Sequence, residues 1–380
     1  MELFKNVKVL ELASVLAGPA VGQFFAELGA EVIKIENEKA GGDVTRSWRS
    51  PDERTDDRSS YFCSVNWGKK SVSLDLASER GHEALQALTA TSDIVITSFK
   101  PGDAEKLGAD YESLKHINEK IIYGEITGYG ANDPRVGYDA VIQAESGFMS
   151  LNGTQDGDPM KMPVALIDIL AAHQLKEGLL LALLNRYQTG KGCRVEVSLL
   201  HTAVSSLANQ ASNWQVGGIV PSRQGSLHPN IAPYGEMFKM NDGNLLLLAV
   251  GNDKQFKELL DSVGLGKLNR DARFSTNQER VANRAVLSNL IGEAIAGLDA
   301  ESLVKNIQAR KVPAGVVRDV REALQTSQAI QLSLTGDGLT GTRTFVSLVS
   351  GKWMTNEALS PPPHLGEHTS EVLRGLSAQS

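Results

Sequence analysis

The first third of the chain alternates short runs of apolar, often β-branched residues with amphipathic stretches. The strand-like runs lie at 8–14, 31–36, 71–76, 93–99 and 120–126. Apolar residues recur at helical spacing between them, at 20–28, 79–90 and 111–120. This alternation predicts parallel strands joined by crossover helices, with ligands bound at the carboxyl ends of the strands.

The pattern then continues as far as residue 214. Helical spacing recurs at 140–149 and 168–188, and the glycines of the TGKG segment at 189–192 favour a helix end. A further strand is expected at 193–200 and a helix at 201–214. These elements complete a first, large domain.

A change of composition marks the end of this domain. Residues 215–233 are rich in Gly, Pro, Ser and Asn, which is typical of a linker. Strand-like runs and amphipathic helices then predict a small α+β domain at 234–325, and one more strand is expected at 345–353. We therefore predict an α/β protein. Its large domain, residues 1–214 and 326–380, holds an open, mostly parallel Rossmann-like sheet.

Composition narrows the class of protein. A length of 380 residues suits two domains, and 41% hydrophobic with 22% charged residues is typical of a soluble globular chain. A net charge of −7 argues against nucleic-acid or anionic-membrane partners. The N-terminal residues lack the regions of a signal peptide, and no apolar run reaches the roughly 20 residues that span a bilayer. A cytoplasmic location is expected.

Neither the cysteines nor the histidines indicate a metal site. Cys63 and Cys193 are far apart, which argues against a disulfide framework or a cysteine zinc site. His364 and His368 are spaced i, i+4, but they follow three prolines and need not share a helix face. We expect no bound metal.

Asp168 is the most notable candidate for chemistry. It lies in the apolar stretch MPVALIDILAAHQL. A carboxylate in such surroundings must find hydrogen-bond donors or have its pKa raised, which makes it a functional candidate. Aspartate is also a good N-cap for a following helix. The local sequence leaves both interpretations open.

Other candidates are weaker. The LAGPAVG segment at 16–22 lies where a strand turns into a helix, and its glycines allow a ligand to approach the backbone. It is not GxGxxG, so Glu36 at the end of the second strand indicates a dinucleotide site only weakly. Basic residues beside turns could contact phosphates, although each is more typical of a solvated surface; they are Arg46, Arg49, Lys69 and Lys70.

Ten segments together resemble the class III CoA-transferases, which include formyl-CoA, carnitine-CoA and succinyl-CoA transferases. They occur in the family's order over nearly the whole chain and read KVLELASVLAGP, LGAEVIKIE, GDVTR, KKSVSLDL, DIVITSFKPG, EKLGADYESL, YDAVIQAESG, ALIDILA, NRYQTGKG and LGEHTSEVL. The resemblance implies an enzyme with catalytic Asp168, which would form covalent anhydride and aspartyl-CoA thioester intermediates. It also implies an interlocked homodimer.

The resemblance further implies coenzyme A as a co-substrate, with no tightly bound cofactor, and a small carboxylic acid as its partner. The implied CoA contacts are Leu16, Ala17, Asn37, Arg46, Leu74, Asp75, Ser98, Phe99, Lys106, Gly137 and Tyr138. Asn37 departs from the arginine that formyl-CoA transferases place after the second strand. We therefore expect Arg46 to supply that phosphate contact.

Two further segments bear on the reaction. The segment RQGSLHPN has only Gly225 where formyl-CoA transferases carry a glycine-rich loop, and it resembles relatives that use succinyl-CoA and dicarboxylic acids. The related α-methylacyl-CoA racemases have a histidine where this chain has Tyr138, and tyrosine, with a pKa of about 10, is a poor proton shuttle. Racemase chemistry and a non-catalytic CoA-binding protein are the alternatives to CoA transfer.

Overall fold

The computed structural model describes residues 3–349, 352–353 and 359–377. The chain divides into two compact units. The first comprises Met1–Met149, Lys161–Ile219 and Ile330–Ser380, and the second comprises Ser150–Met160 and Val220–Ala329.

The segment 150–160 belongs to the second unit, although the sequence analysis placed it in the large domain. Arg223 explains this placement, because its guanidinium donates hydrogen bonds to the carbonyl oxygens of Ser150 and Gly157. The amide of Gly225 also donates to the carbonyl of Gly153. These contacts join segments far apart in sequence, so local composition could not reveal them.

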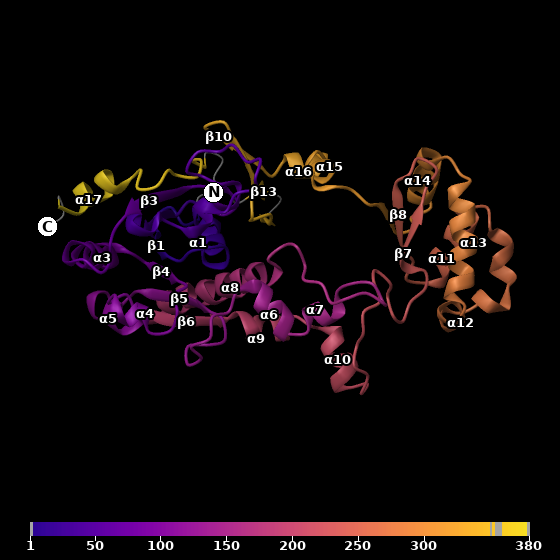
Figure 1. Cartoon of the computed structure of the whole chain (residues 1–380), viewed down its shortest axis with the longest axis horizontal. Coiled ribbons are helices and arrows are strands. Elements are labelled where there is room, and N and C mark those ends of the chain that lie inside the picture. The colour runs from indigo at the N-terminus through magenta and orange to yellow at the C-terminus, as the bar shows by residue number, and fades with distance from the viewer. Residues whose placement is uncertain (1–2, 350–351, 354–358, 378–380) are drawn as a thin grey trace. The chain divides into compact units, whose positions relative to one another are not determined.

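A six-stranded parallel sheet forms the centre of the first unit (Figure 1). Its strands, in spatial order, are β3 (Lys69–Ser73), β2 (Glu31–Glu36), β1 (Lys8–Leu12), β4 (Ile94–Thr97), β5 (Ile122–Thr127) and β6 (Cys193–Ser198). Every neighbouring pair is parallel, so the predicted α/β class and open parallel sheet are confirmed. The order reverses between β1 and β4, which opens a crevice at their carboxyl ends.

Helices cover both faces of this sheet. Side chains alternate along the strands, so that Val9 and Ile94 belong to one core cluster while Leu10 and Val95 belong to another. The first cluster packs against α1 (Ala17–Glu27) and α8 (Leu166–Thr189). The second packs against α3 (Glu79–Thr91), α5 (Tyr111–Ile117) and α17 (Thr369–Ser377). The unit is therefore a three-layer α/β/α structure.

Shorter helices connect these layers, and two predicted helices are each broken in two. The predicted helix 201–214 is α9 (Leu199–Ser205) and α10 (Asn209–Gln215), separated where Ala208 has a φ of 48°. The predicted helix 140–149 is α6 (Asp139–Glu145) and α7 (Phe148–Leu151), separated where Gly147 has a φ of 94°. The other short elements are η1 (Glu38–Ala40), η2 (Val44–Ser47), α2 (Ser60–Cys63) and α4 (Asp103–Lys106).

The C-terminal part of the first unit forms hairpins and then follows the sheet. Strand β10 (Ser333–Gly336) pairs with β11 (Leu339–Thr342), and β12 (Leu348–Val349) pairs with β13 (Lys352–Trp353). The predicted single strand at 345–353 is therefore wrong, because its described residues include two short strands that pair antiparallel; residues 350–351 of that segment lie outside the described residues.

After residue 359 the chain runs along β3. The amide of Gly366 donates to Ser71 Oγ, and the Ser73 amide donates to Thr369 Oγ1. These bonds occupy donors and acceptors at the edge of the sheet, where unpaired strands would otherwise be open to other chains.

The second unit has its own core. Strands β7 (Tyr234–Lys239), β8 (Leu245–Ala249) and β9 (Ala314–Val316) form an antiparallel sheet that confirms the smaller α+β part. Its core includes Leu246, Leu259 and Ile291. The accompanying helices are α11 (Asp253–Ser262), η3 (Gly266–Arg270), η4 (Ala272–Phe274), α12 (Asn277–Ala282), α13 (Arg284–Ala296), α14 (Ala300–Ala309) and α15 (Val320–Leu324), with α16 (Ser327–Ile330) at the unit boundary.

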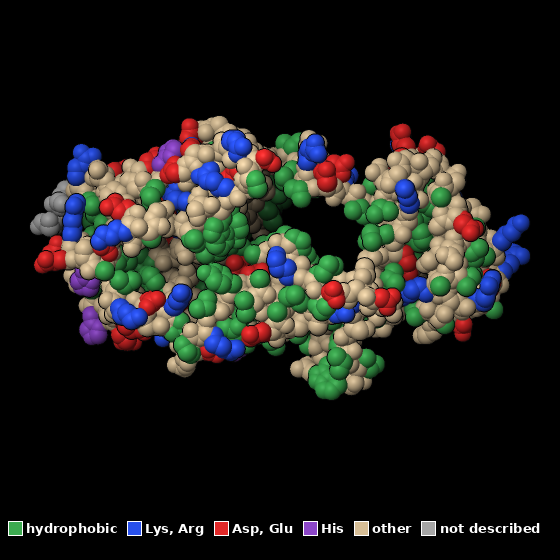
Figure 2. Space-filling model, viewed as in Figure 1, with side chains coloured by type: hydrophobic (Ala, Val, Ile, Leu, Met, Phe, Trp, Pro, Cys, Tyr) green, Lys and Arg blue, Asp and Glu red, His purple; other side chains and the backbone are tan. Residues whose placement is uncertain are grey.

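Charged side chains of both signs are mixed over the visible surface rather than gathered by sign (Figure 2). Within the described ranges, no helix combines the length and the apolar character needed to cross a membrane.

The packing of α8 on the sheet makes Leu175 a sensitive position. Leu175 is fully buried, and its Cδ1 lies where a Cβ on Gly124 of β5 would approach within 3.2 Å. Leu175→Ala is expected to lower the free energy of unfolding by about 2 to 5 kcal/mol. Urea denaturation followed by circular dichroism measures this loss. The exposed Leu3→Ala is the control, and equal effects of the two substitutions would contradict the predicted packing.

Candidate active site

Two pockets lie at the carboxyl edge of the parallel sheet. The first has a volume of about 250 Å³ and lies at the ends of β1, β2 and β3. The second has a volume of about 190 Å³ and lies at the ends of β1, β4 and β5. Both are lined by Ser14 and Phe99, so they adjoin one another at the point where the strand order reverses.

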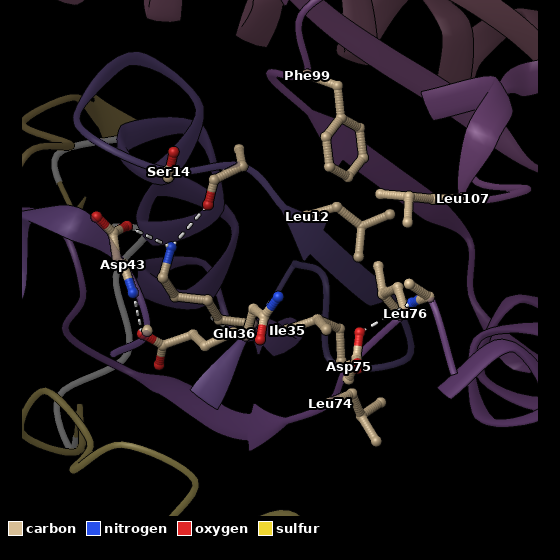
Figure 3. A pocket seen from close by; sticks show the side chains of 15 residues that line it. Leu12, Ser14, Ile35, Glu36, Asp43, Leu74, Asp75, Leu76, Phe99 and Leu107 are labelled. Atoms are coloured by element: carbon tan, nitrogen blue, oxygen red, sulfur yellow. Dashed lines mark hydrogen bonds and ion pairs between the residues drawn. The ribbon is translucent and has the colours of Figure 1, made fainter. Parts of the chain in front are cut away.

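The structure brings most of the sequence-predicted residues into these pockets. Those lining the first pocket are Asn37, Leu74, Asp75 and Phe99. Those lining the second are Leu16, Ala17, Ser98, Phe99, Gly137, Tyr138 and Asp168. Figure 3 shows the first pocket with Asp43 and Glu36 towards one end and the apolar Phe99 and Leu107 towards the other. One continuous region thus offers both polar and apolar contacts.

Arg46 and Lys106 lie outside both linings. Arg46 is 5% exposed, and its Nε and Nη2 donate to the Glu36 carboxylate at 2.8 and 2.7 Å. Its guanidinium also stacks 3.7 Å from the centre of the Phe62 ring. Because Arg46 is buried with its donors engaged, we leave it out of the proposed phosphate contacts. Lys106 is exposed and pairs with Asp103 at 2.8 Å.

Asp168 lies in the first turn of α8 and is not its N-cap. The helix begins at Leu166, and its N-cap position is Ala165, which has no side-chain cap. The capping acceptor comes from another helix, since Asp139 Oδ1 accepts a hydrogen bond from the Ile167 amide at 2.8 Å. The capping interpretation of Asp168 is therefore wrong.

Hydrogen bonds to Asp139 and Gln143 hold the first turn of α8 and the segment before it. Asp139 Oδ2 accepts from Gln143 Nε2 at 2.7 Å, and Gln143 Oε1 accepts from the Met162 amide at 2.7 Å. Asp139 is buried, so its carboxylate also acts electrostatically on Asp168. Asp139 lies in the segment YDAVIQAESG, but no signal in the sequence indicated this role.

The carboxyl group of Asp168 is poorly solvated. It is 8% exposed, and no described residue donates a hydrogen bond to its carboxylate. Burial, and then the negative charge of Asp139, raise the pKa of Asp168 to about 7. A carboxylate of this kind is more basic, and a stronger nucleophile, than one in water, yet part of it is ionised at neutral pH.

Tyr61 is a neighbour that the sequence did not indicate. Burial raises the pKa of its hydroxyl, as do the charges of Asp168, Asp139 and Asp43 in that order. Its ring packs edge-on against Trp48 with 5.2 Å between ring centres. Tyr61 lies on the short helix α2, far from Asp168 in sequence, and no motif links the two.

Gly137 has a packing role beside its place in the second pocket. A Cβ at Gly137 would lie 2.6 Å from Gly128 Cα, and one at Gly128 would lie 2.7 Å from Gly137 Cα. The two backbones therefore touch where β5 ends, and this contact fixes the turn that carries Tyr138. Side chains at either position would push the turn away.

An exposed group at the surface contains Asp56, Asp57 and His364, whose ligand atoms lie within 4.8 Å of one another. Arg58 already pairs with Asp56, and the Leu365 amide donates to Asp57 Oδ2 at 2.7 Å. His364 Nδ1 also contacts Asp57 Oδ1. These contacts account for the group, and we assign no metal to it.

Comparison with known proteins places this arrangement in a family. The sequence pattern described as CoA-transferase family III matches residues 4–369. The chain belongs to CoA-transferase family III. This membership confirms both the resemblance seen in the sequence and the prediction that the protein is a transferase.

The sequence similarity of this transferase to individual relatives extends over nearly the whole chain. It is 38% identical to succinate–glutarate CoA-transferase from Agrobacterium fabrum, over 98% of this chain and 95% of the relative. It is 33% identical to succinyl-CoA:glutarate CoA-transferase from Homo sapiens, over 97% of this chain and 85% of the relative. The crystal structure of a CaiB/BaiF family protein from Brucella suis matches with a TM-score of 0.86 and 38% identity, covering 98% of both chains.

The buried carboxyl group makes the stability of this transferase depend on pH. The folded-state pKa of Asp168 is raised to about 7, so its proton stabilises the fold below the ordinary pKa near 4. That contribution is lost as the pH rises through 7. Asp168→Asn, which is neutral at every pH, should therefore be more stable than the wild type at pH 8, by up to about 4 kcal/mol, and similar to it at pH 4.

Chemical denaturation of both proteins at the two pH values measures this difference. The exposed Asp52→Asn controls for the loss of one carboxylate. An Asp168→Asn effect that stays constant between pH 4 and pH 8 would contradict the raised pKa.

Proposed function

We propose that this transferase moves CoA from an acyl-CoA donor to a free carboxylic acid, with Asp168 as the covalent carrier. The observation that carries the proposal is the position of the Asp168 carboxylate. It is buried and poorly solvated, and it lines the same pocket as the loop between β1 and α1. A nucleophile in such a place splits one difficult exchange into easier steps.

The first half of the reaction would transfer CoA to the protein. The Asp168 carboxylate attacks the thioester carbonyl carbon, the C–S bond breaks, and the CoA thiolate leaves behind a mixed anhydride. The thiolate then attacks the aspartyl carbonyl of that anhydride, which releases the donor acid and leaves an aspartyl-CoA thioester. The second half repeats these two steps in reverse with the acceptor carboxylate, which regenerates Asp168.

The raised pKa of Asp168 suits this chemistry. A carboxylate with a pKa of about 7 is a stronger base than an ordinary carboxylate, so its attack on the thioester is favoured. Asp139 contributes to this pKa and holds the first turn of α8, so we assign it a positioning role. No proton needs to leave the substrate in any of the steps.

We propose that CoA lies across the two pockets. The residues expected to contact it are Leu16, Ala17, Asn37, Leu74, Asp75, Ser98, Phe99, Gly137 and Tyr138. Lys100 lines the second pocket and is a cation that the sequence analysis did not identify. Its ammonium group is suited to a phosphate of CoA. We therefore assign to Lys100 the phosphate contact that was expected of Arg46.

The substrates we propose are succinyl-CoA and a small dicarboxylic acid. Several relatives are named for such pairs, with glutarate in one group and mesaconate in another. Another relative is an acetyl-CoA:oxalate CoA-transferase, so the choice of donor is not uniform among them. Assays with succinyl-CoA against glutarate, mesaconate, oxalate and a monocarboxylic acid would rank the acceptors.

Trapping of the carrier tests the mechanism directly. Incubation with succinyl-CoA followed by hydroxylamine should convert Asp168 to its hydroxamate, because hydroxylamine attacks both the anhydride and the aspartyl thioester. Peptide mass spectrometry locates the change, and it should be absent in Asp168→Asn, which should also lose transferase activity.

The matched control for this experiment is Asp52→Asn, which should keep both the adduct and the activity. Turnover without any modification of Asp168 would contradict the covalent route. Deuterium exchange at the substrate α-carbon in D₂O without an acceptor acid would instead indicate the proton transfer of a racemase.

We also propose that the transferase is an interlocked homodimer in which linkers near residues 200–230 and 320–330 join the large and small domains. Apolar side chains exposed on α8 and α10 support a partner chain, and Figure 2 shows apolar side chains at the tip of α10. The largest are Leu181, Leu184, Tyr187 and Trp214.

The double variant Leu181→Glu, Leu184→Glu should weaken the dimer, because each buried carboxylate would lack a partner. Light scattering after size-exclusion chromatography measures the mass. Leu3→Glu, at an exposed leucine that is not part of α8 or α10, should leave the dimer intact. A wild-type mass equal to one chain would contradict the proposal.

A further inference from the structure

The loop between β1 and α1, residues 13–16, contains a strained residue. Val15 has a φ of 73°, in the left-handed region. A β-branched side chain there is a genuine outlier, because its Cβ approaches the neighbouring carbonyl. Ser14 of this loop lines both pockets, and Val15 and Leu16 line the pocket that contains Asp168. A conformation of this kind persists only when surrounding contacts enforce it.

Asp43 makes the contact at the strained residue itself. Its Oδ1 accepts a hydrogen bond from the Val15 amide at 3.3 Å. The same oxygen accepts from the Thr45 amide at 3.0 Å and from Thr45 Oγ1 at 2.8 Å, and the Asp43 amide donates to Glu36 Oε2 at 2.9 Å. Asp43 is therefore held rigidly and presents a fixed acceptor to Val15.

Two buried lysines hold the backbone on either side of the loop. Lys34 Nζ donates to the Ala13 carbonyl at 2.7 Å, just before Val15. Lys69 Nζ donates to the Pro19 carbonyl at 2.8 Å, in the first turns of α1. The loop is thus fixed before, at and after its strained residue by three side chains from other segments.

The same side chains form one buried network of charges. Lys34 pairs with Glu11 at 3.0 Å and with Asp43 at 2.9 Å, and Lys69 pairs with Glu11 at 2.7 Å. The four side chains are at most 1% exposed, and their two positive and two negative charges balance. Buried ion pairs of this kind are weak evidence for stability but can specify one conformation. Here the conformation that they specify is that of the loop beside Asp168.

We infer that Asp43, supported by Lys34, Lys69 and Glu11, is a positioning residue that holds the Val15 turn in its left-handed conformation and so shapes the acyl-CoA contact beside Asp168. The inference rests on the proposed CoA transfer for its kinetic test. Its structural part concerns only the loop and can be measured without substrate. The network acts on the reaction through the loop, not by contact with the reacting atoms.

Asp43→Ala removes the acceptor of the Val15 amide and the partner of Lys34. The loop should relax towards a negative φ, which should lower kcat/KM by about tenfold or more, the cost expected of leaving a strained backbone conformation unsupported. In hydrogen exchange without ligand, the peptide that contains Val15 should exchange faster than in the wild type. Calorimetric titration with CoA should show a raised Kd.

Glycine at position 15 separates positioning from a general structural role. Glycine adopts a positive φ without strain, so Val15→Gly should reduce the need for Asp43. Asp43→Ala should therefore cost about three- to tenfold less in kcat/KM when introduced into Val15→Gly than into the wild type, each variant being compared with its own parent. Val15→Ala keeps a Cβ and should give a much smaller rescue.

The outcomes separate this inference from the proposed function. If the wild type transfers CoA but Val15→Gly leaves the Asp43→Ala loss unchanged, the inference is overturned while the function stands. If the wild type shows no CoA transfer, the proposed function fails. The inference about the loop is tested separately, and it is overturned if hydrogen exchange of the peptide that contains Val15 is the same in Asp43→Ala as in the wild type. If Asp43→Ala does not fold, Asp43→Asn replaces it, because asparagine keeps an acceptor oxygen without the charge. Asp43→Asn should lower kcat/KM by less than Asp43→Ala, and Val15→Gly should again reduce the loss.

Discussion

The pairing of β1 with β4 is the constraint on which the site depends. These strands are separated along the chain by β2 and β3, yet they lie side by side in the middle of the sheet and run in parallel. Since all six strands point the same way, the loops after β1, β4 and β5 emerge at one edge. The second pocket is lined by all three loops and by the first turn of α8. No local interaction could assemble it.

The buried carboxylates near the carboxyl edge of the parallel sheet include those paired with a lysine and, in contrast, that of Asp168. The carboxylates of Glu11 and Asp43 are matched by Lys34 and Lys69, so the network is neutral and its members hold the backbone. Among the residues that the structure describes, Asp168 has no such partner, and the nearby Asp139 adds a like charge. The contrast is what separates a structural carboxylate from a reactive one, because only the unpaired group keeps its basicity available for a substrate.

Asp139 both holds the helix that carries Asp168 and changes the pKa of Asp168. Its carboxylate caps α8 through the Ile167 amide and, by its charge, raises the pKa of Asp168 one residue further along. The helix therefore needs no cap of its own at Ala165. A single side chain from α6 thus supports both the position and the basicity of the proposed carrier.

Local sequence patterns by themselves determined most of the secondary structure and indicated the family. Short apolar, often β-branched runs predicted the parallel strands and helical spacing predicted α8, because burial between two helical layers imposes those patterns directly. The order of ten short segments indicated the family, which full-length comparison shows. Breaks such as that at Ala208 escaped prediction, because a single positive φ leaves no mark in the spacing of apolar residues.

Tertiary structure alone decided the roles of individual charged side chains. In the sequence Arg46 beside turn glycines suited a phosphate, but folding buries it against Glu36 and Phe62. From the sequence Asp168 could have been a helix cap, but α8 begins at Leu166 and its Ile167 amide donates to Asp139 instead. In each case the deciding partner lies on another element. The sequence determines which side chains are present, whereas their charge state and availability depend on distances that only the packed fold sets.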